Sequence, residues 1–121
     1  MNFDPKPYIE GILAANREEL AKIAARRERA LEEARRIARE IIGHDPSTKR
    51  VLLFGSLTGE GPKHLNFDID IALDEGDPYL AMDITERSEF SVDVVRLDRV
   101  PQHVRERIEQ TGIVLAERDS A

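Results

Sequence analysis

Apolar residues recur at three- and four-residue steps along the first third of the chain. This spacing predicts one long amphipathic helix from Arg17 to Ile42. Asn16 suits the N-cap, and Gly43 suits the position just past the C-terminus. The segment Pro7 to Ala15 predicts a separate short helix, because prolines punctuate its start. The apolar positions of the long helix are Leu20, Ile23, Ala24, Leu31, Ala34, Ile37, Ala38, Ile41 and Ile42.

The pattern changes to that of strands after residue 50. Val51 to Phe54 is a short apolar run that stops at a glycine, which predicts a buried strand delivering a turn. From Phe67 to Leu73, apolar residues alternate with Asp68, Asp70 and an alanine. This period of two predicts a strand whose two aspartates lie on one face, roughly 7 Å apart.

The remaining segments complete a small α+β domain. The sequence predicts a helix over 79–88 after Asp77-Pro78, a strand over 91–97, a helix from Pro101 toward Gly112, and a closing strand over 113–115. This order favours a small mixed β-sheet flanked by helices. We therefore expect an N-terminal helical extension, residues 1–49, followed by a domain of residues 50–121. The long helix is expected to pack on the sheet near its C-terminal half and to extend free at its N-terminal half.

Composition narrows the classes of function. The 121 residues include no cysteine and no apolar stretch of membrane-spanning length, so we expect a cytoplasmic protein without disulfides or a membrane anchor. Residues 1–50 carry 11 Lys and Arg against 9 Asp and Glu, whereas the remainder carries 7 against 15. The acidic second half argues against a broad nucleic-acid-binding face. The arginines of 26–39 alternate with glutamates, which favours a solvated face linked by salt bridges.

The candidate chemistry lies at the strand ends. Gly55 and Ser56 follow the first strand, where glycine allows close backbone approach and the serine hydroxyl and nearby N–H groups can donate to phosphate oxygens. Asp68 and Asp70 repel each other but suit a hard cation that takes oxygen ligands. Asp93 lies among valines and needs a partner to offset its desolvation, and a shared metal would supply one. Taken one at a time, these residues are usually an ordinary turn and a solvated strand face.

Together, these segments resemble the minimal nucleotidyltransferases, a branch of the polymerase-beta-like superfamily. The resemblance covers about residues 50–116 and rests on Leu53-Phe54-Gly55-Ser56, Gly59, 68–73 and 92–95. It implies a nucleotidyltransferase fold, with Gly55 and Ser56 holding a nucleoside triphosphate and Asp68 and Asp70 binding Mg²⁺. Asp93 would be the third carboxylate, near the attacking hydroxyl. In place of the arginine that often follows the serine, Lys63 and His64 are the nearest basic residues.

Two functions remain open at this stage. In the first, the protein transfers a nucleoside monophosphate, AMP from ATP, to a hydroxyl acceptor. Relatives of this size are antitoxins, which implies a helical toxin protein as partner. Assembly of this chain into a homo-oligomer is also compatible with the sequence. In the second, the chain is a catalytically degenerate module that acts by stoichiometric binding. Leu57, Phe67 and a loop one residue longer than is usual in the family favour this alternative, whereas the three aspartates favour the enzyme.

Overall fold

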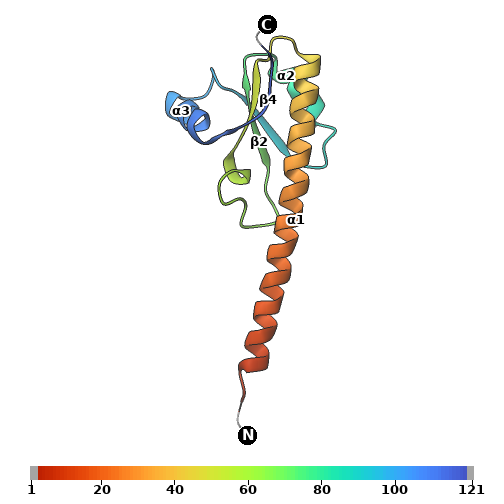
Figure 1. Cartoon of the computed structure of the whole chain (residues 1–121), viewed down its shortest axis with the longest axis vertical. Helices are drawn as coiled ribbons and strands as arrows, with labels where there is room; N and C mark the ends of the chain where they lie inside the picture. The colour runs from red at the N-terminus through yellow and green to blue at the C-terminus, as the bar shows by residue number, and fades with distance from the viewer. Residues whose placement is uncertain (1–2, 120–121) are drawn as a thin grey trace.

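The computed structural model describes residues 3–119, which form a small sheet with helices on both faces and one long projecting helix (Figure 1). The elements in chain order are α1 (Lys6–His44), β1 (Arg50–Phe54), the 3₁₀ turn η1 (Gly55–Leu57), β2 (Ile69–Asp74), α2 (Pro78–Thr85), β3 (Val92–Arg96), α3 (Gln102–Thr111) and β4 (Ile113–Glu117). The predicted α+β class and every predicted strand are confirmed, with ends shifted by a few residues.

The sheet is mixed, as predicted, with strand order β3-β2-β1-β4. β1 pairs antiparallel with both β2 and β4, whereas β2 and β3 run parallel. The parallel pair requires a crossover, and α2 supplies it. As a result, the C-terminal end of β1 and the N-terminal ends of β2 and β3 lie at the same end of the sheet.

The strands bury both faces. One face packs under α1 and α2 through residues such as Leu53, Ile71 and Ile37. The other face packs under α3, where Leu52 and Ala72 meet Ile108. Figure 1 shows α1 and α3 on opposite sides of the sheet. Because both faces are covered, the central strands read as nearly continuous apolar runs, and a polar residue on them stands out.

α1 is one helix rather than two. The predicted break at Asn16 is wrong, because Asn16 lies inside the helix, and the residues around it are alanines and charged residues that favour helix. A single asparagine costs only about 0.6 kcal/mol relative to alanine there, which does not end a helix. Pro5 and Pro7 instead mark the start. Gly43 is within the last turn, and Asp45 is the C-cap.

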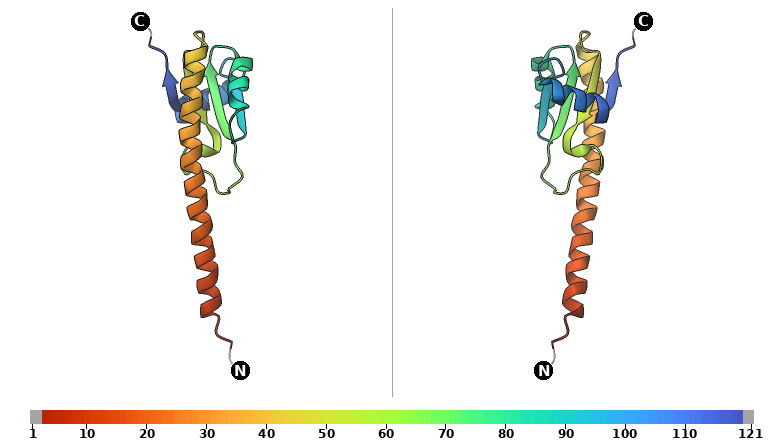
Figure 2. Two further views of the ribbon diagram at one scale, coloured as in Figure 1. Left: turned by 90° about the vertical axis from the view of Figure 1, so that its right-hand side faces the viewer. Right: turned by 90° about the vertical axis from the view of Figure 1, so that its left-hand side faces the viewer.

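The prediction that α1 packs only in part is confirmed. Its buried residues are Ile23 and five positions from Ala30 to Ile41, whereas residues 3–22 are all exposed. Figure 2 shows this N-terminal segment projecting beyond the rest of the molecule. Within residues 3–119, no helix combines the length and the apolar character that crossing a membrane requires.

Buried polar contacts tie the end of α1 to the loop before α2. The side chain of Asp45 is 7% exposed and accepts hydrogen bonds from the Asp77 amide at 2.7 Å, the Ser47 amide at 3.0 Å and the Thr48 hydroxyl at 3.1 Å. The bond from Asp77 is the largest cause that holds the pKa of Asp45 below its ordinary value. Asp45 therefore contributes to stability as a carboxylate.

We predict that Asp45→Ala lowers the free energy of unfolding at pH 7 by about 1–3 kcal/mol, because three buried or partly buried hydrogen bonds lose their acceptor. The pKa of Asp45 is lower in the folded state, so its contribution is present above the unfolded pKa and is lost as the pH falls through the folded one. Urea unfolding at pH 7 and near pH 3 measures the difference. Asp83→Ala, on the exposed side of α2, is the control. An equal loss for both variants would contradict this role for Asp45.

Candidate nucleotide and metal site

The phosphate-binding candidate is a tight turn at the end of β1. Gly55 has a φ of +79°, and a Cβ on it would lie 2.2 Å from Asp70 Oδ2, so only glycine fits without displacing that carboxylate. The Gly55 carbonyl accepts hydrogen bonds from the Thr58 amide at 3.1 Å and the Thr58 hydroxyl at 2.7 Å, which fixes the turn. Ser56 is exposed at its outer side.

The sheet register places Asp70 and Asp93 side by side. Asp70 pairs with Phe54 on β1 and with Asp93 on β3, so Asp70 lies beside the end of β1 where the turn begins, and Asp93 lies on the far side of Asp70. Asp70 lies on the same strand face as Ala72, and Asp93 on the same face as Val95, which is the face that packs under α3. The turn and the two carboxylates thus converge from three neighbouring strands.

The carboxylates of Asp70 and Asp93 repel each other when both are ionised. Burial, the charge of Asp93 and a hydrogen bond with it raise the pKa of Asp70 to about 6, and the charge of Asp68 adds to the shift. Within residues 3–119, none of the three carboxylates forms an ion pair with lysine or arginine. An uncompensated group of carboxylates at a strand end is typical of sites that receive a cation.

Asp68 directly precedes β2 rather than lying within it. The strand begins at Ile69, and the side chain of Asp68 is exposed in the loop before it, although its charge contributes to the raised pKa of Asp70. In the described part of the chain, no three His, Cys, Asp or Glu side chains converge into an arrangement that could hold a metal ion. Asp70 and Asp93 nevertheless offer adjacent hard oxygen donors without a basic partner, and this donor set fits a divalent cation such as Mg²⁺.

Lys63 and His64 lie in the exposed loop between η1 and β2. No hydrogen bond or ion pair among residues 3–119 joins the Lys63 ammonium to the turn or to the aspartates. A role for Lys63 in triphosphate binding therefore stays a prediction.

This loop is held by arginines of α1, which sequence reasoning assigned to a solvated face. Arg27 donates to the carbonyls of Leu57 at 3.4 Å and Gly59 at 3.2 Å, and Arg26 donates to that of Leu65 at 3.0 Å. The Arg26 guanidinium also lies 4.6 Å from the ring centroid of Phe90. Both arginines thus fix the loop that carries Lys63 and leads into Asp68.

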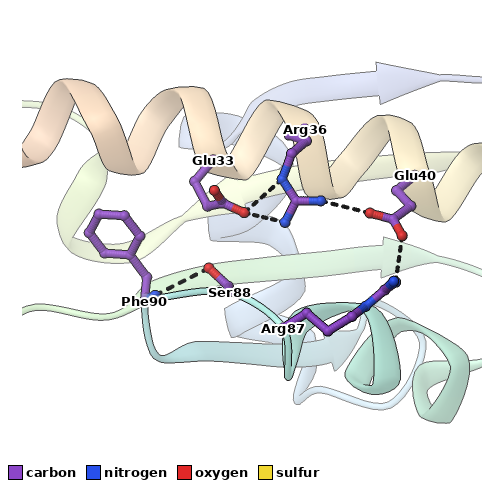
Figure 3. Close-up of polar contacts among 6 residues, drawn as sticks. All are labelled: Glu33, Arg36, Glu40, Arg87, Ser88 and Phe90. Carbon is purple, nitrogen blue, oxygen red and sulfur yellow. Dashed lines mark hydrogen bonds and ion pairs between the residues drawn. The ribbon is translucent and has the colours of Figure 1, made fainter.

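The salt-bridge prediction is wrong for Arg26 and Arg27 but confirmed for Arg36. Arg36 pairs with Glu33 and Glu40 on its own helix, and Glu40 also pairs with Arg87 at 2.5 Å (Figure 3). What distinguishes Arg27 from Arg36 is the face of α1 on which each arginine lies. Arg27 lies on the buried stripe of α1 between Ile23 and the alanines, where an arginine needs a partner outside the helix.

A cavity next to the turn adds residues that do not figure among the candidates predicted from the sequence. It measures about 300 Å³ and is lined by Phe54, Val104 and Ile108 together with His103 and Arg107 of α3. Phe54 immediately precedes Gly55 and pairs with Asp70, so the cavity adjoins the candidate site. Arg107 brings positive charge to a neighbourhood that is otherwise acidic. No single sequence motif marks Arg107, because its relevance depends on how α3 packs against β1.

Several solved structures share this fold. A chain of a mutant MntA–HpeT toxin–antitoxin complex is 21% identical over 65% of this chain and 68% of its own, with a TM-score of 0.54. A chain of the MntA–HepT toxin–antitoxin complex is 17% identical over 75% and 73%, with a TM-score of 0.52. A protein from Sulfolobus solfataricus that is described as a nucleotidyltransferase is 19% identical over 83% of this chain and 91% of its own, with a TM-score of 0.54.

Sequence comparison alone finds no counterpart. No family model matches the chain, and no curated protein matches it. At identities near 20%, the structural neighbours establish the architecture rather than the chemistry. This chain has the fold of the minimal nucleotidyltransferases.

Proposed function

We propose that this protein is a Mg²⁺-dependent nucleotidyltransferase that transfers a nucleoside monophosphate, AMP from ATP, to a hydroxyl group of another protein. The observation that carries the proposal is the pairing of Asp70 with Asp93 directly against the Gly55 turn. Two carboxylates without a basic partner, next to a backbone turn with exposed donors, combine a cation site with a phosphate site. That combination is required for chemistry at a nucleoside triphosphate.

Each residue has a distinct task in this proposal. Gly55 lets the backbone approach the phosphates, and the Ser56 hydroxyl donates to a phosphate oxygen. Asp70 and Asp93 hold Mg²⁺, with Asp68 as a further ligand from the loop; the bound cation would neutralise charge on the triphosphate. Lys63 and the cavity residue Arg107 supply positive charge to the triphosphate.

Asp93 has a second task at the acceptor. Its side chain is exposed, unlike the half-buried Asp70, so an incoming hydroxyl can reach it. Asp93 orients this hydroxyl and accepts its proton as the oxygen attacks the α-phosphorus. The new bond joins the acceptor oxygen to the α-phosphorus, and the bond from that phosphorus to the bridging oxygen of pyrophosphate breaks. Little covalent chemistry is required of the protein, which mainly positions the groups.

The acceptor is proposed to be a protein. Two of the structural neighbours are chains of toxin–antitoxin complexes, which supports a toxin as the partner. The described chain is a single small domain, and its catalytic half is acidic, so an extended nucleic-acid substrate would find little basic surface there.

A second candidate is a degenerate module that binds its partner without transferring a nucleotide. What favours it is that, in the described part of the chain, the three carboxylates do not by themselves form a three-ligand site. In that case, the Asp70–Asp93 pair would be a cost to stability without a compensating ligand. Nucleotide binding followed by a search for transfer distinguishes the two candidates.

Isothermal titration calorimetry tests the enzyme directly. We predict that MgATP binds the wild-type protein and that Asp70→Asn and Asp93→Asn each weaken binding by at least about tenfold, or 1.4 kcal/mol. Asp83→Asn removes an acidic side chain from exposed α2 and should leave affinity unchanged. Absence of binding to the wild type would overturn the enzyme. Binding without incorporation of labelled AMP into a co-purified partner would favour the degenerate module.

The raised pKa of Asp70 gives a second prediction, for the metal-free protein. The folded state binds this proton more tightly than the unfolded state does, so ionisation destabilises the fold as the pH rises from about 4 through about 6. Asp70→Asn should therefore raise the free energy of unfolding at pH 8, by up to about 3 kcal/mol, and have little effect near pH 4. Chemical denaturation in a chelating buffer measures this. A variant less stable than the wild type at pH 8 would contradict the assigned repulsion.

A further inference from the structure

The row of residues through which α1 packs on the sheet continues into the exposed N-terminal part of the helix, residues 6–22. Along the helix, alternating steps of three and four residues connect the buried positions to exposed ones. In the exposed segment, residues 6–22, Ile9 is 50%, Leu13 52% and Leu20 63% exposed. The full stripe consists of Ile9, Leu13, Asn16, Leu20, Ile23, Arg27, Ala30, Ala34, Ile37 and Ile41. Such a stripe is the seam of a two-stranded coiled coil.

We propose that residues 6–22 of two copies of this chain pair as an antiparallel coiled coil and make the protein a homodimer. In this pairing, Ile9 of one copy lies opposite Leu20 of the other, and Leu13 lies opposite Asn16. Each contact occurs twice, as two-fold symmetry requires. The seam buries Ile9, Leu13 and Leu20, which the isolated chain leaves in water.

The antiparallel direction follows from the position of the globular part. From Ile23 onward, the same stripe is covered by the chain's own sheet and by the loop that Arg27 holds. A parallel partner helix in register would run along the stripe into this sheet. An antiparallel partner instead leaves past the N-terminus of α1, and Figure 2 shows the chain's own sheet at the opposite end of this helix.

The lengths also match. The free segment is about 25 Å long at 1.5 Å per residue, and in this register its first turn lies opposite the last free turn of the partner. Each globular part therefore begins near the point where the partner's helix ends, so the two segments overlap over their whole length.

Charge supports a second copy as the occupant. Glu10 and Arg17 flank the stripe on the same side, one heptad apart. In an antiparallel pair, Glu10 of each copy faces Arg17 of the other, which gives two ion pairs per dimer. In a parallel pair, Arg17 would face Ile12, and neither charge would find its complement. Acidic and basic residues are also equal in number in this segment, so two copies do not repel: Lys6, Arg17 and Lys22 against Glu10, Glu18 and Glu19.

Sedimentation velocity of the full chain between about 1 μM and about 1 mM, a range suited to a small helical interface, tests the dimer. We expect a monomer–dimer equilibrium that Leu13→Glu/Leu20→Glu abolishes. Both positions are exposed in the single chain, so thermal melting followed by circular dichroism should show an intact globular part. A wild-type monomer at every concentration, or a dimer that survives this double variant, would overturn the proposal.

Charge reversal tests the direction of the pairing. Glu10→Arg should raise the dimer dissociation constant by about fivefold, because two exposed ion pairs become repulsive. Arg17→Glu should do the same, and the double reversal Glu10→Arg/Arg17→Glu should restore the wild-type value. Glu18→Arg, away from the seam, is the control. Single reversals that leave the constant unchanged, or a double reversal without rescue, would rule out the antiparallel register. The dimer and the nucleotide site are independent, since neither test involves the other's residues.

Discussion

The parallel pairing of β2 with β3 is the constraint on which the candidate site depends. Its register sets Asp70 beside Asp93, and the antiparallel partner β1 brings the Gly55 turn against the same carboxylate. No single strand contains this arrangement. The fold therefore concentrates negative charge at one end of the sheet and raises the pKa of Asp70 there. A fold stabilised only by its apolar core would not need this arrangement, which is why we interpret it as functional.

α1 supports the candidate site without contributing a residue to it. Its C-terminal half forms much of the core under the sheet, and its middle supplies Arg26 and Arg27 to the loop before β2. The loop carries Lys63 and determines where Asp68 lies, so the helix influences the site without contributing a ligand. Its N-terminal part extends beyond the globular region and remains available to another chain. One helix thus links the core, the loop and an interaction surface.

Much of this architecture could be predicted from the sequence. Strand periodicity and the glycine after β1 identify the elements and the aspartates, because local pattern determines strand face and turn. The continuity of α1 could not be predicted from its prolines and Asn16, since weak local signals yield to a long run of helix-forming residues. The contacts of Arg26 and Arg27, and the position of Arg107, depend on packing between segments distant in sequence. The parallel register that sets Asp70 beside Asp93 likewise depends on the pairing of segments distant in sequence.

The central claim is that Asp70, Asp93 and the Gly55 turn form one site for a metal and a nucleotide. Backbone amide NMR during titration with Mn²⁺ and ATP tests it most directly, because the paramagnetic ion broadens signals of nearby residues first. The account predicts early loss of the Gly55, Asp70 and Asp93 amide signals, while those of Glu75 and Asp83 remain. Early broadening at Glu75 or Asp83, or no selective broadening at saturating nucleotide, would contradict it.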